Sequence, residues 1–223
     1  MPVTRREFTA GAAATLSGLG VPFGGGLGGA LVSGTAASAQ ASAYFAGAVD
    51  DNGFSYRKTN FGRIDPVWHR QMVQYYSSEP AGTVVVDTQN HFLYWVVENQ
   101  TAMRYGVGVG REGFQWFGRA RIDRKALWPR WVPPPEMLER QPDLPRMVEG
   151  GAPDNPLGPR ALYLYRDGQD LGYRLHGTIE PWSIGNDVSS GCIRMFPEDV
   201  VDLYLRCPIG TAVLVLPHIA DQG

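Results

Sequence analysis

The chain has 223 residues, which suits one domain of ordinary size with additional segments. Hydrophobic residues make up 43% of the chain and aromatic residues 11%, so it can bury a substantial core. The formal net charge of −2 gives no basic field for holding nucleic acid or an anionic membrane surface. Nucleic acid is therefore excluded as an expected partner.

Residues 1–43 have the pattern of an export signal. Arg5 and Arg6 lie shortly before Phe8, a glycine- and alanine-rich apolar stretch follows, and small-x-small cleavage patterns occur near its end. The paired arginines resemble the twin-arginine form of such signals. A retained membrane anchor is the alternative, but so many glycines would weaken a lipid-embedded helix. We predict a twin-arginine-type signal peptide and a periplasmic mature protein.

Residues 44–81 are mixed and aromatic, and we expect them to be a lead-in segment that packs on the main domain. A short helix is predicted over residues 67–76, because Trp68, Met72 and Tyr75 would share one helical face.

From residue 82 onward the sequence has mainly the pattern of β-strands. Residues 83–86 and 92–97 flank a polar connection, as in a hairpin. The main domain is predicted over residues 82–217, with a C-terminal tail at residues 218–223. Further strands are predicted over residues 102–109, 116–122, 161–165, 173–176 and 211–216.

Two stretches of the main domain depart from this pattern. Residues 128–159 are rich in proline and glycine, which predicts an irregular loop of the kind that often forms a lid or the wall of a site. Residues 197–205 are predicted to be a helix, since Pro197 suits a first turn and acidic residues follow it.

The two cysteines have different surroundings. Cys192 lies in a glycine-flanked polar motif, whereas Cys207 follows an apolar run and is predicted to be buried at the end of a helix. A disulfide between them is the alternative, because an exported chain meets an oxidising compartment and connectivity cannot be deduced from sequence.

Cys192 also has the neighbours that a nucleophile needs. A cysteine nucleophile requires a nearby base or imidazolium, together with backbone N–H groups directed at the developing oxyanion. His176 ends a predicted strand upstream, and Gly191 would let the backbone around Cys192 approach a substrate carbonyl. The spacing permits contact between the imidazole and the thiol.

These residues resemble the signature of the L,D-transpeptidase catalytic domain, also called the YkuD domain, in its ErfK/YbiS-like exported form. The signature is His176-Gly177-Thr178, then Ser183-Ile184-Gly185, then Ser189-Ser190-Gly191-Cys192-Ile193-Arg194. Residues 106–110, 131–135 and 155–158 are also similar, so the resemblance covers residues 82–217. It implies a mainly β fold, a β-sandwich or barrel with one or two short helices.

Two positions depart from the family pattern. Many members have histidine where this chain has Ser190, and residues 116–119 replace a stretch that resembles Thr-Pro-x-Gly.

The resemblance implies a role for each motif residue. Cys192 is the nucleophile and His176 the general base, and either the carbonyl of Gly177 or Ser189 orients the imidazole. The N–H of Cys192, together with that of Gly191, forms the oxyanion hole.

The remaining motif residues are candidates for substrate contacts. Arg194 either orders the motif loop or binds a substrate carboxylate through a bidentate pair. Trp182 and Ile184 fit a substrate wall and loop packing equally well. Thr178 and Ser190 complete this set.

The implied reaction is acyl transfer on peptidoglycan. Cys192 attacks the diamino-acid carbonyl of a stem tetrapeptide, releases D-alanine, and forms a thioester that an amine acceptor resolves. The acceptor is another stem peptide or an outer-membrane protein or lipoprotein, and neither a cofactor nor a metal is expected. We also expect an imidazolium at His176 to lower the pKa of the Cys192 thiol; the alternative is a thiol that burial keeps protonated.

Three other functions are weighed against this one. The same site would act as an L,D-carboxypeptidase if water replaced the amine. Papain-like and NlpC/P60-like cell-wall hydrolases place the cysteine before the histidine, whereas here His176 comes before Cys192. A wall-binding module without activity would not need the intact motif.

Overall fold

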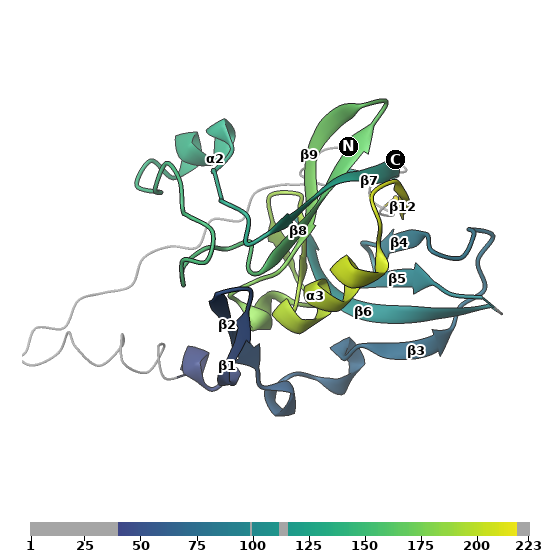
Figure 1. Ribbon diagram of the computed structural model, residues 1–223, viewed down its shortest axis with the longest axis horizontal. Helices are drawn as coiled ribbons and strands as arrows, with labels where there is room; N and C mark the ends of the chain where they lie inside the picture. Colours follow the sequence, from purple (N-terminus) through teal and green to yellow (C-terminus); the bar gives the residue numbers. More distant parts are fainter. Residues whose placement is uncertain (1–39, 99, 112–115, 218–223) are drawn as a thin grey trace, which may run out of the picture.

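The computed structural model describes residues 40–98, 100–111 and 116–217, and Figure 1 shows their arrangement. Most of the described elements are strands, with the short helices α2 (Pro135–Arg140) and α3 (Pro197–Arg206). This confirms the predicted mainly β fold class. Residues 1–39 of the predicted signal peptide and the tail at 218–223 lie outside the described residues.

The strands form a small hairpin and one closed sheet. Strands β1 (Phe45–Asp51) and β2 (Phe54–Thr59) pair antiparallel with each other. The larger sheet has the order β10-β6-β11-β9-β8-β7-β12-β4-β5, and β3 adds to β6. Because β5 at the end of this order also pairs with β6 near its beginning, the sheet closes as a barrel. The bounds are β3 Gln71–Gln74, β4 Val84–Asp87, β5 Phe92–Val96, β6 Thr101–Gly110, β7 Gly118–Leu127, β8 Arg160–Arg166, β9 Gln169–His176, β10 Asp187–Ser189, β11 Ile193–Met195 and β12 Thr211–Val215.

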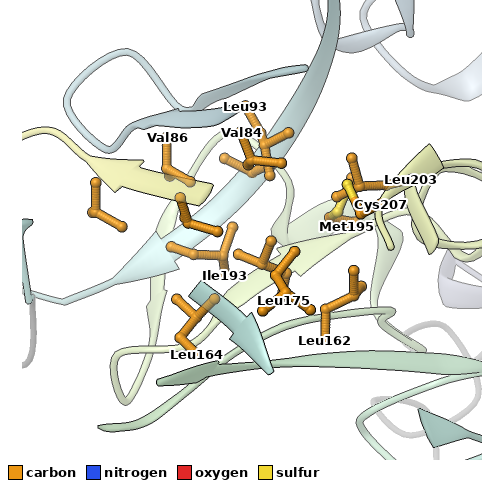
Figure 2. Close-up of a cluster of buried hydrophobic side chains, with 14 of the residues drawn as sticks. Val84, Val86, Leu93, Leu162, Leu164, Leu175, Ile193, Met195, Leu203 and Cys207 are labelled. Carbon is orange, nitrogen blue, oxygen red and sulfur yellow. The ribbon is translucent and has the colours of Figure 1, made fainter. Parts of the chain in front are cut away.

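Aliphatic side chains from facing strands form the core of the barrel. In β12 the side chains of Val213 and Val215 are buried while Ala212 is exposed, as strand alternation requires. Figure 2 shows the buried cluster with side chains from several strands and from α3: Val84, Val86, Leu93, Leu162, Leu164, Leu175, Ile193, Met195, Leu203 and Cys207.

Helix α3 lies where a helix was predicted over residues 197–205. Side chains from two strands of the barrel, β6 and β7, form hydrogen bonds with it. The Tyr105 hydroxyl of β6 donates to the Asp202 carboxylate at 2.6 Å. The Lys125 ammonium of β7 donates to the carbonyls of Tyr204 and Cys207 at 2.6 and 2.7 Å, which stabilises the negative end of the helix. Cys207 is fully buried and both cysteines are free, so its predicted burial is confirmed and the disulfide alternative is wrong.

The helix predicted over residues 67–76 is wrong. A short 3-10 turn, η2 (Pro66–Trp68), is followed by strand β3, which pairs antiparallel with β6. The spacing of Trp68, Met72 and Tyr75 fits a helix, but Met72 is 51% exposed and takes no part in a buried face. Pairing with the backbone of β6 outweighs this weak local pattern.

The long loop of residues 128–159 is largely irregular, as predicted. Its exceptions are α2 and an isolated antiparallel bridge between Trp131 and Val148. Buried Asn155 holds the loop together: its amide donates to the carbonyls of Pro129 and Glu149 at 2.8 and 2.9 Å.

The hairpin β1–β2 fastens the lead-in segment to the barrel, although the sequence pattern did not predict these strands. The Asp51 carboxylate accepts two hydrogen bonds, at 2.6 and 2.7 Å, from the guanidinium of Arg160, whose side chain is 5% exposed. The Trp128 indole donates to the carbonyl of Asp51 at 3.0 Å. At the other end of the hairpin, Thr59 donates to the Glu198 carboxylate from its N–H at 2.7 Å and from its hydroxyl at 2.8 Å.

Replacing Asp51 with Ala should lower the free energy of unfolding by about 3 kcal/mol, because it leaves the buried Arg160 charge without its partner. Arg160 lowers the pKa of the Asp51 carboxyl, so the contribution of this pair is complete above the unfolded-state pKa and is lost as pH falls through the lowered one. Urea unfolding at neutral pH would measure the effect. Asp50→Ala, at the exposed neighbouring position of the same strand, is the control. Equal stability of the two variants would contradict the prediction.

Candidate active site

The pairing of β9 with β11 brings His176 and Cys192 onto one face of the sheet. The two strands are parallel, with Ile193 opposite Leu175 and Arg194 opposite His176. Ile193 and Leu175 point into the core, so the alternate residues on each strand point away from it. Cys192, immediately before β11, therefore shares a face with His176 and Arg194.

His176 is held as a neutral imidazole. Its side chain is buried, and its Nδ1 lies 2.5 Å from the carbonyl oxygen of Gly177. Because a carbonyl only accepts hydrogen bonds, Nδ1 carries the proton and Nε2 keeps its lone pair. Burial lowers the pKa of His176 to about 4, and the positive charges of Arg194 and Arg174 act in the same direction. The ring is thus an acceptor at neutral pH.

Cys192 is held as a thiol. Its side chain is partly exposed, and its Sγ lies 4.0 Å from the carbonyl oxygen of Gly172. Burial raises the pKa of the thiol, opposed by the N–H of Arg174 and by the charges of Arg174 and Arg194. No hydrogen bond joins this Sγ to the His176 ring within the part of the chain that is described. The pKa directions favour the alternative of a neutral thiol over the expected thiolate–imidazolium pair.

Ser189 orders the backbone around Cys192. Its buried hydroxyl donates to the carbonyl of Cys192 at 2.5 Å and accepts from the N–H of Gly191 at 3.1 Å. Of the two expected partners for the imidazole, only the carbonyl of Gly177 is hydrogen-bonded to it. Gly191 has a φ of 112°, a conformation that favours glycine, and its N–H is already engaged by Ser189.

Gly177 itself is tightly enclosed by the end of the long loop. A Cβ atom there would lie 3.0 Å from Cδ of Pro159 and 3.1 Å from the carbonyl oxygen of Leu157. Its N–H donates to the carbonyl of Arg160 at 3.3 Å. The loop thereby fixes the carbonyl that orients His176.

Arg194 is paired with a carboxylate of the same chain. Its guanidinium donates to Glu180 at 2.6 Å, and the buried hydroxyl of Thr178 accepts from the N–H of Glu180 at 3.0 Å. In this structure Arg194 therefore orders the loop between His176 and Cys192, which is one of its two expected roles.

The other substrate-contact candidates occupy different environments. Ile184 is buried against Ile64 and Phe196, which agrees with loop packing. Trp182 is 40% exposed, with its ring centroid 5.6 Å from that of Tyr44. Ser190 is exposed.

Sequence reasoning missed several neighbours of the thiol. Arg174 lies on the face of β9 that carries His176, and it forms a two-point ion pair with Asp170 at 2.7 and 3.0 Å. Tyr173 stacks on Trp116 with ring centroids 5.7 Å apart. Burial raises the pKa of the Tyr173 hydroxyl, and a negative charge on Cys192 would raise it further. Strand alternation from His176 could have identified Arg174.

Among residues 40–98, 100–111 and 116–217, no group of three or more histidine, cysteine or acidic side chains is placed to hold a metal ion. In the same ranges no helix is long and apolar enough to cross a membrane.

The chain matches a known domain over the region that contains this site. The model of the YkuD family, described as the L,D-transpeptidase catalytic domain, matches residues 81–215. The chain therefore belongs to the YkuD L,D-transpeptidase family.

Several individual proteins are similar to this chain. The chain is 33% identical over 143 residues to the probable L,D-transpeptidase ErfK/SrfK of Escherichia coli (strain K12), which covers 60% of this chain and 44% of that protein. It is 48% identical over 134 residues to the putative L,D-transpeptidase YqjB of Bacillus subtilis (strain 168), covering 59% of this chain and 69% of that one. An L,D-transpeptidase from Mycobacterium smegmatis has a TM-score of 0.46 and 16% identity, covering 76% of this chain and 66% of its own. The chain thus spans less than half of the Escherichia coli relative.

The raised thiol pKa leads to a test of the resting state. Iodoacetamide should alkylate Cys192 slowly below about pH 8, because an ordinary thiol already titrates near ~8.5 and burial moves this one higher. His176→Ala should barely shift the profile, since a neutral imidazole does not stabilise the thiolate. Intact-mass measurement against pH, in a Cys207→Ala background, would report Cys192 alone. Fast alkylation below pH 7 that disappears in His176→Ala would instead indicate a preformed ion pair.

Proposed function

We propose that this protein is a peptidoglycan L,D-transpeptidase in which Cys192 is the nucleophile and His176 the base. The observation that carries the proposal is the parallel register of β9 and β11, in which both residues share one face. The contact of Nδ1 of His176 with the Gly177 carbonyl supports it, because Nδ1 must then be the donor and Nε2 the acceptor. Membership of the YkuD family supports the class of reaction.

The first half of the reaction forms a thioester. As Cys192 Sγ attacks the diamino-acid carbonyl of a stem tetrapeptide, the thiol proton moves to Nε2 of His176. The Gly177 carbonyl, which accepts from Nδ1, stabilises the imidazolium that forms. The backbone N–H of Cys192 stabilises the oxyanion. The intermediate collapses when the imidazolium returns its proton to the leaving amine of D-alanine.

The second half transfers the acyl group to an amine. The acceptor amine attacks the thioester, Nε2 of His176 takes its proton, and the Cys192 thiol is restored with that proton. The acceptor is another stem peptide, with an outer-membrane protein or lipoprotein as a further candidate. No metal or cofactor enters this sequence.

The surrounding charges suit an anionic substrate. Arg174 and Arg194 lie close enough to Cys192 to favour its charged form. Arg174 is paired with Asp170 and Arg194 with Glu180. A substrate carboxylate would bind by replacing Asp170 or Glu180 as the partner of one arginine. Hydrolysis by the same residues, with water as the acceptor, is the second candidate function and would make the protein an L,D-carboxypeptidase.

Cys192→Ala should abolish turnover, because a thioester needs a cysteine and the second cysteine of the chain, Cys207, is buried in the core. Incubation with disaccharide-tetrapeptide followed by mass analysis would resolve three outcomes: transpeptidation, hydrolysis, and exchange of the terminal D-alanine for a free D-amino acid. Cys207→Ala is the matched control: this thiol is buried in the core, its pKa is raised to about 12, and activity should persist. Loss of activity in folded Cys207→Ala, with activity kept in Cys192→Ala, would overturn the assignment.

We further propose that the chain reaches the periplasm by the twin-arginine route. The basis is the Arg5-Arg6 pair of the leader, which lies outside the described residues. Replacing both arginines by lysine should leave precursor in the cytoplasm, measured by cell fractionation and immunoblotting. Unchanged export would contradict this route.

A further inference from the structure

A small pocket lies between the lead-in segment and the loop that joins His176 to Cys192. Its volume is about 140 Å³. One wall comes from residues outside the region that matches the family, and the other comes from the loop. The lining residues that matter here are Tyr44, Arg63, Asp65 and Trp68 on one side and Trp182 and Ile184 on the other.

Trp68, which lines the pocket, is closely packed by its neighbours. A Cβ on Gly106 would lie 2.7 Å from the carbonyl oxygen of Trp68, and one on Gly185 would lie 2.5 Å from its ring. Gly185 also has a φ of 82°, which favours glycine. The Trp68 ring packs on Phe92 with centroids 5.2 Å apart. Gly106 thus leaves room for the backbone of Trp68, and Gly185 leaves room for its indole.

The opposite wall is also held in place. Ile184 is buried with Ile64 and Phe196 in a second apolar cluster. Trp182 is flanked by Tyr44 at 5.6 Å and by Phe45 at 6.4 Å between ring centroids, yet it remains 40% exposed. A large aromatic side chain is therefore fixed in position with a free surface.

The lining combines aromatic surface with polar groups at its rim. Tyr44, Trp68 and Trp182 supply ring faces and edges, which suit the C–H face of a pyranose ring. The exposed Arg63 supplies donors and the exposed Asp65 supplies acceptors. One basic and one acidic side chain leave the lining without net charge, so it suits a neutral ligand rich in hydroxyl and amide groups.

We propose that this pocket binds an N-acetylated pyranose of the glycan strand to which the stem peptide is attached. The inference rests on the proposed function, because it assigns the pocket to the same polymer. In that polymer two residues separate the attacked diamino acid from the sugar, a span of roughly 10 Å in extended form. The wall of the pocket begins at Pro181, next in the chain to the Glu180 that pairs with Arg194, so the pocket and the candidate site share the loop between His176 and Cys192.

A binding experiment tests the pocket without turnover. The purified full-length chain, with nitrogen-15 in its tryptophan indoles, is titrated with a β-1,4-linked N-acetylglucosamine tetramer and followed by NMR. The indole signals of Trp68 and Trp182, assigned with Trp68→Phe and Trp182→Phe, should shift and saturate. The unacetylated glucose tetramer should shift them less. Unmoved Trp68 and Trp182 signals, or equal shifts from free tetrapeptide, would overturn the proposal.

A kinetic experiment tests whether the pocket serves the reaction. The KM for disaccharide-tetrapeptide should be about tenfold below that for free tetrapeptide, the size expected from one aromatic stack with its hydrogen bonds. In Arg63→Ala and Trp182→Ala this ratio should approach unity. Tyr76→Ala removes an aromatic of the lead-in segment that is 78% exposed and does not line the pocket, and it should keep the wild-type ratio.

The possible outcomes distinguish failure of the sugar site from failure of the proposed transpeptidase function. Equal KM values for both substrates in the wild-type chain, or a ratio that neither Arg63→Ala nor Trp182→Ala changes, would overturn the sugar site and leave the transpeptidase proposal standing. No product from either substrate would overturn the proposed function, and the NMR titration would then decide the sugar site by itself. Thermal unfolding of each variant would show whether a change reflects loss of fold.

Discussion

The parallel pairing of β9 with β11 is the constraint on which the rest of the site depends. It exists only because the loop between His176 and Cys192 returns the chain alongside the strand it has just left, and because β11 is also paired with β6 on its other side. Core packing of Leu175 and Ile193 on one face fixes the register, so His176 and Cys192 lie on the opposite face. A shift of one residue would turn them into the core.

The same burial that fixes the geometry also sets the protonation states. Both pKa shifts oppose an ion pair: burial lowers the pKa of His176 and raises that of Cys192. A neutral pair costs less in a partly buried site than two separated charges. In the mechanism proposed above, the Gly177 carbonyl stabilises the imidazolium as it forms, and Arg174 and Arg194 stabilise negative charge on Cys192. Proton transfer during attack follows more naturally from this arrangement than a stored thiolate does.

Sequence reasoning succeeded where the signal was local. The hairpin of β4 and β5, the helix α3 and the burial of Cys207 each follow from residues that are close together in the chain. It failed where a feature of the structure depends on residues that are far away in the chain. Strand β3 forms because β6 offers it a partner, and strands as short as β10 and β11 carry too few residues to show a period. The pairs Asp51–Arg160 and Glu180–Arg194 required the folded backbone, and the pKa directions required burial.

The lead-in segment belongs physically to the domain that carries the site. Asp51 holds Arg160, the carbonyl of Arg160 accepts from the N–H of Gly177, and the carbonyl of Gly177 orients His176. Strand β3 extends the sheet at β6, and the Thr59–Glu198 contact joins the hairpin to α3. The position where the family match begins is therefore a boundary in sequence similarity and not a boundary of the folded domain. The contacts that position the imidazole cross it, so a chain trimmed at that point would lose support for the site together with one wall of the pocket beside it.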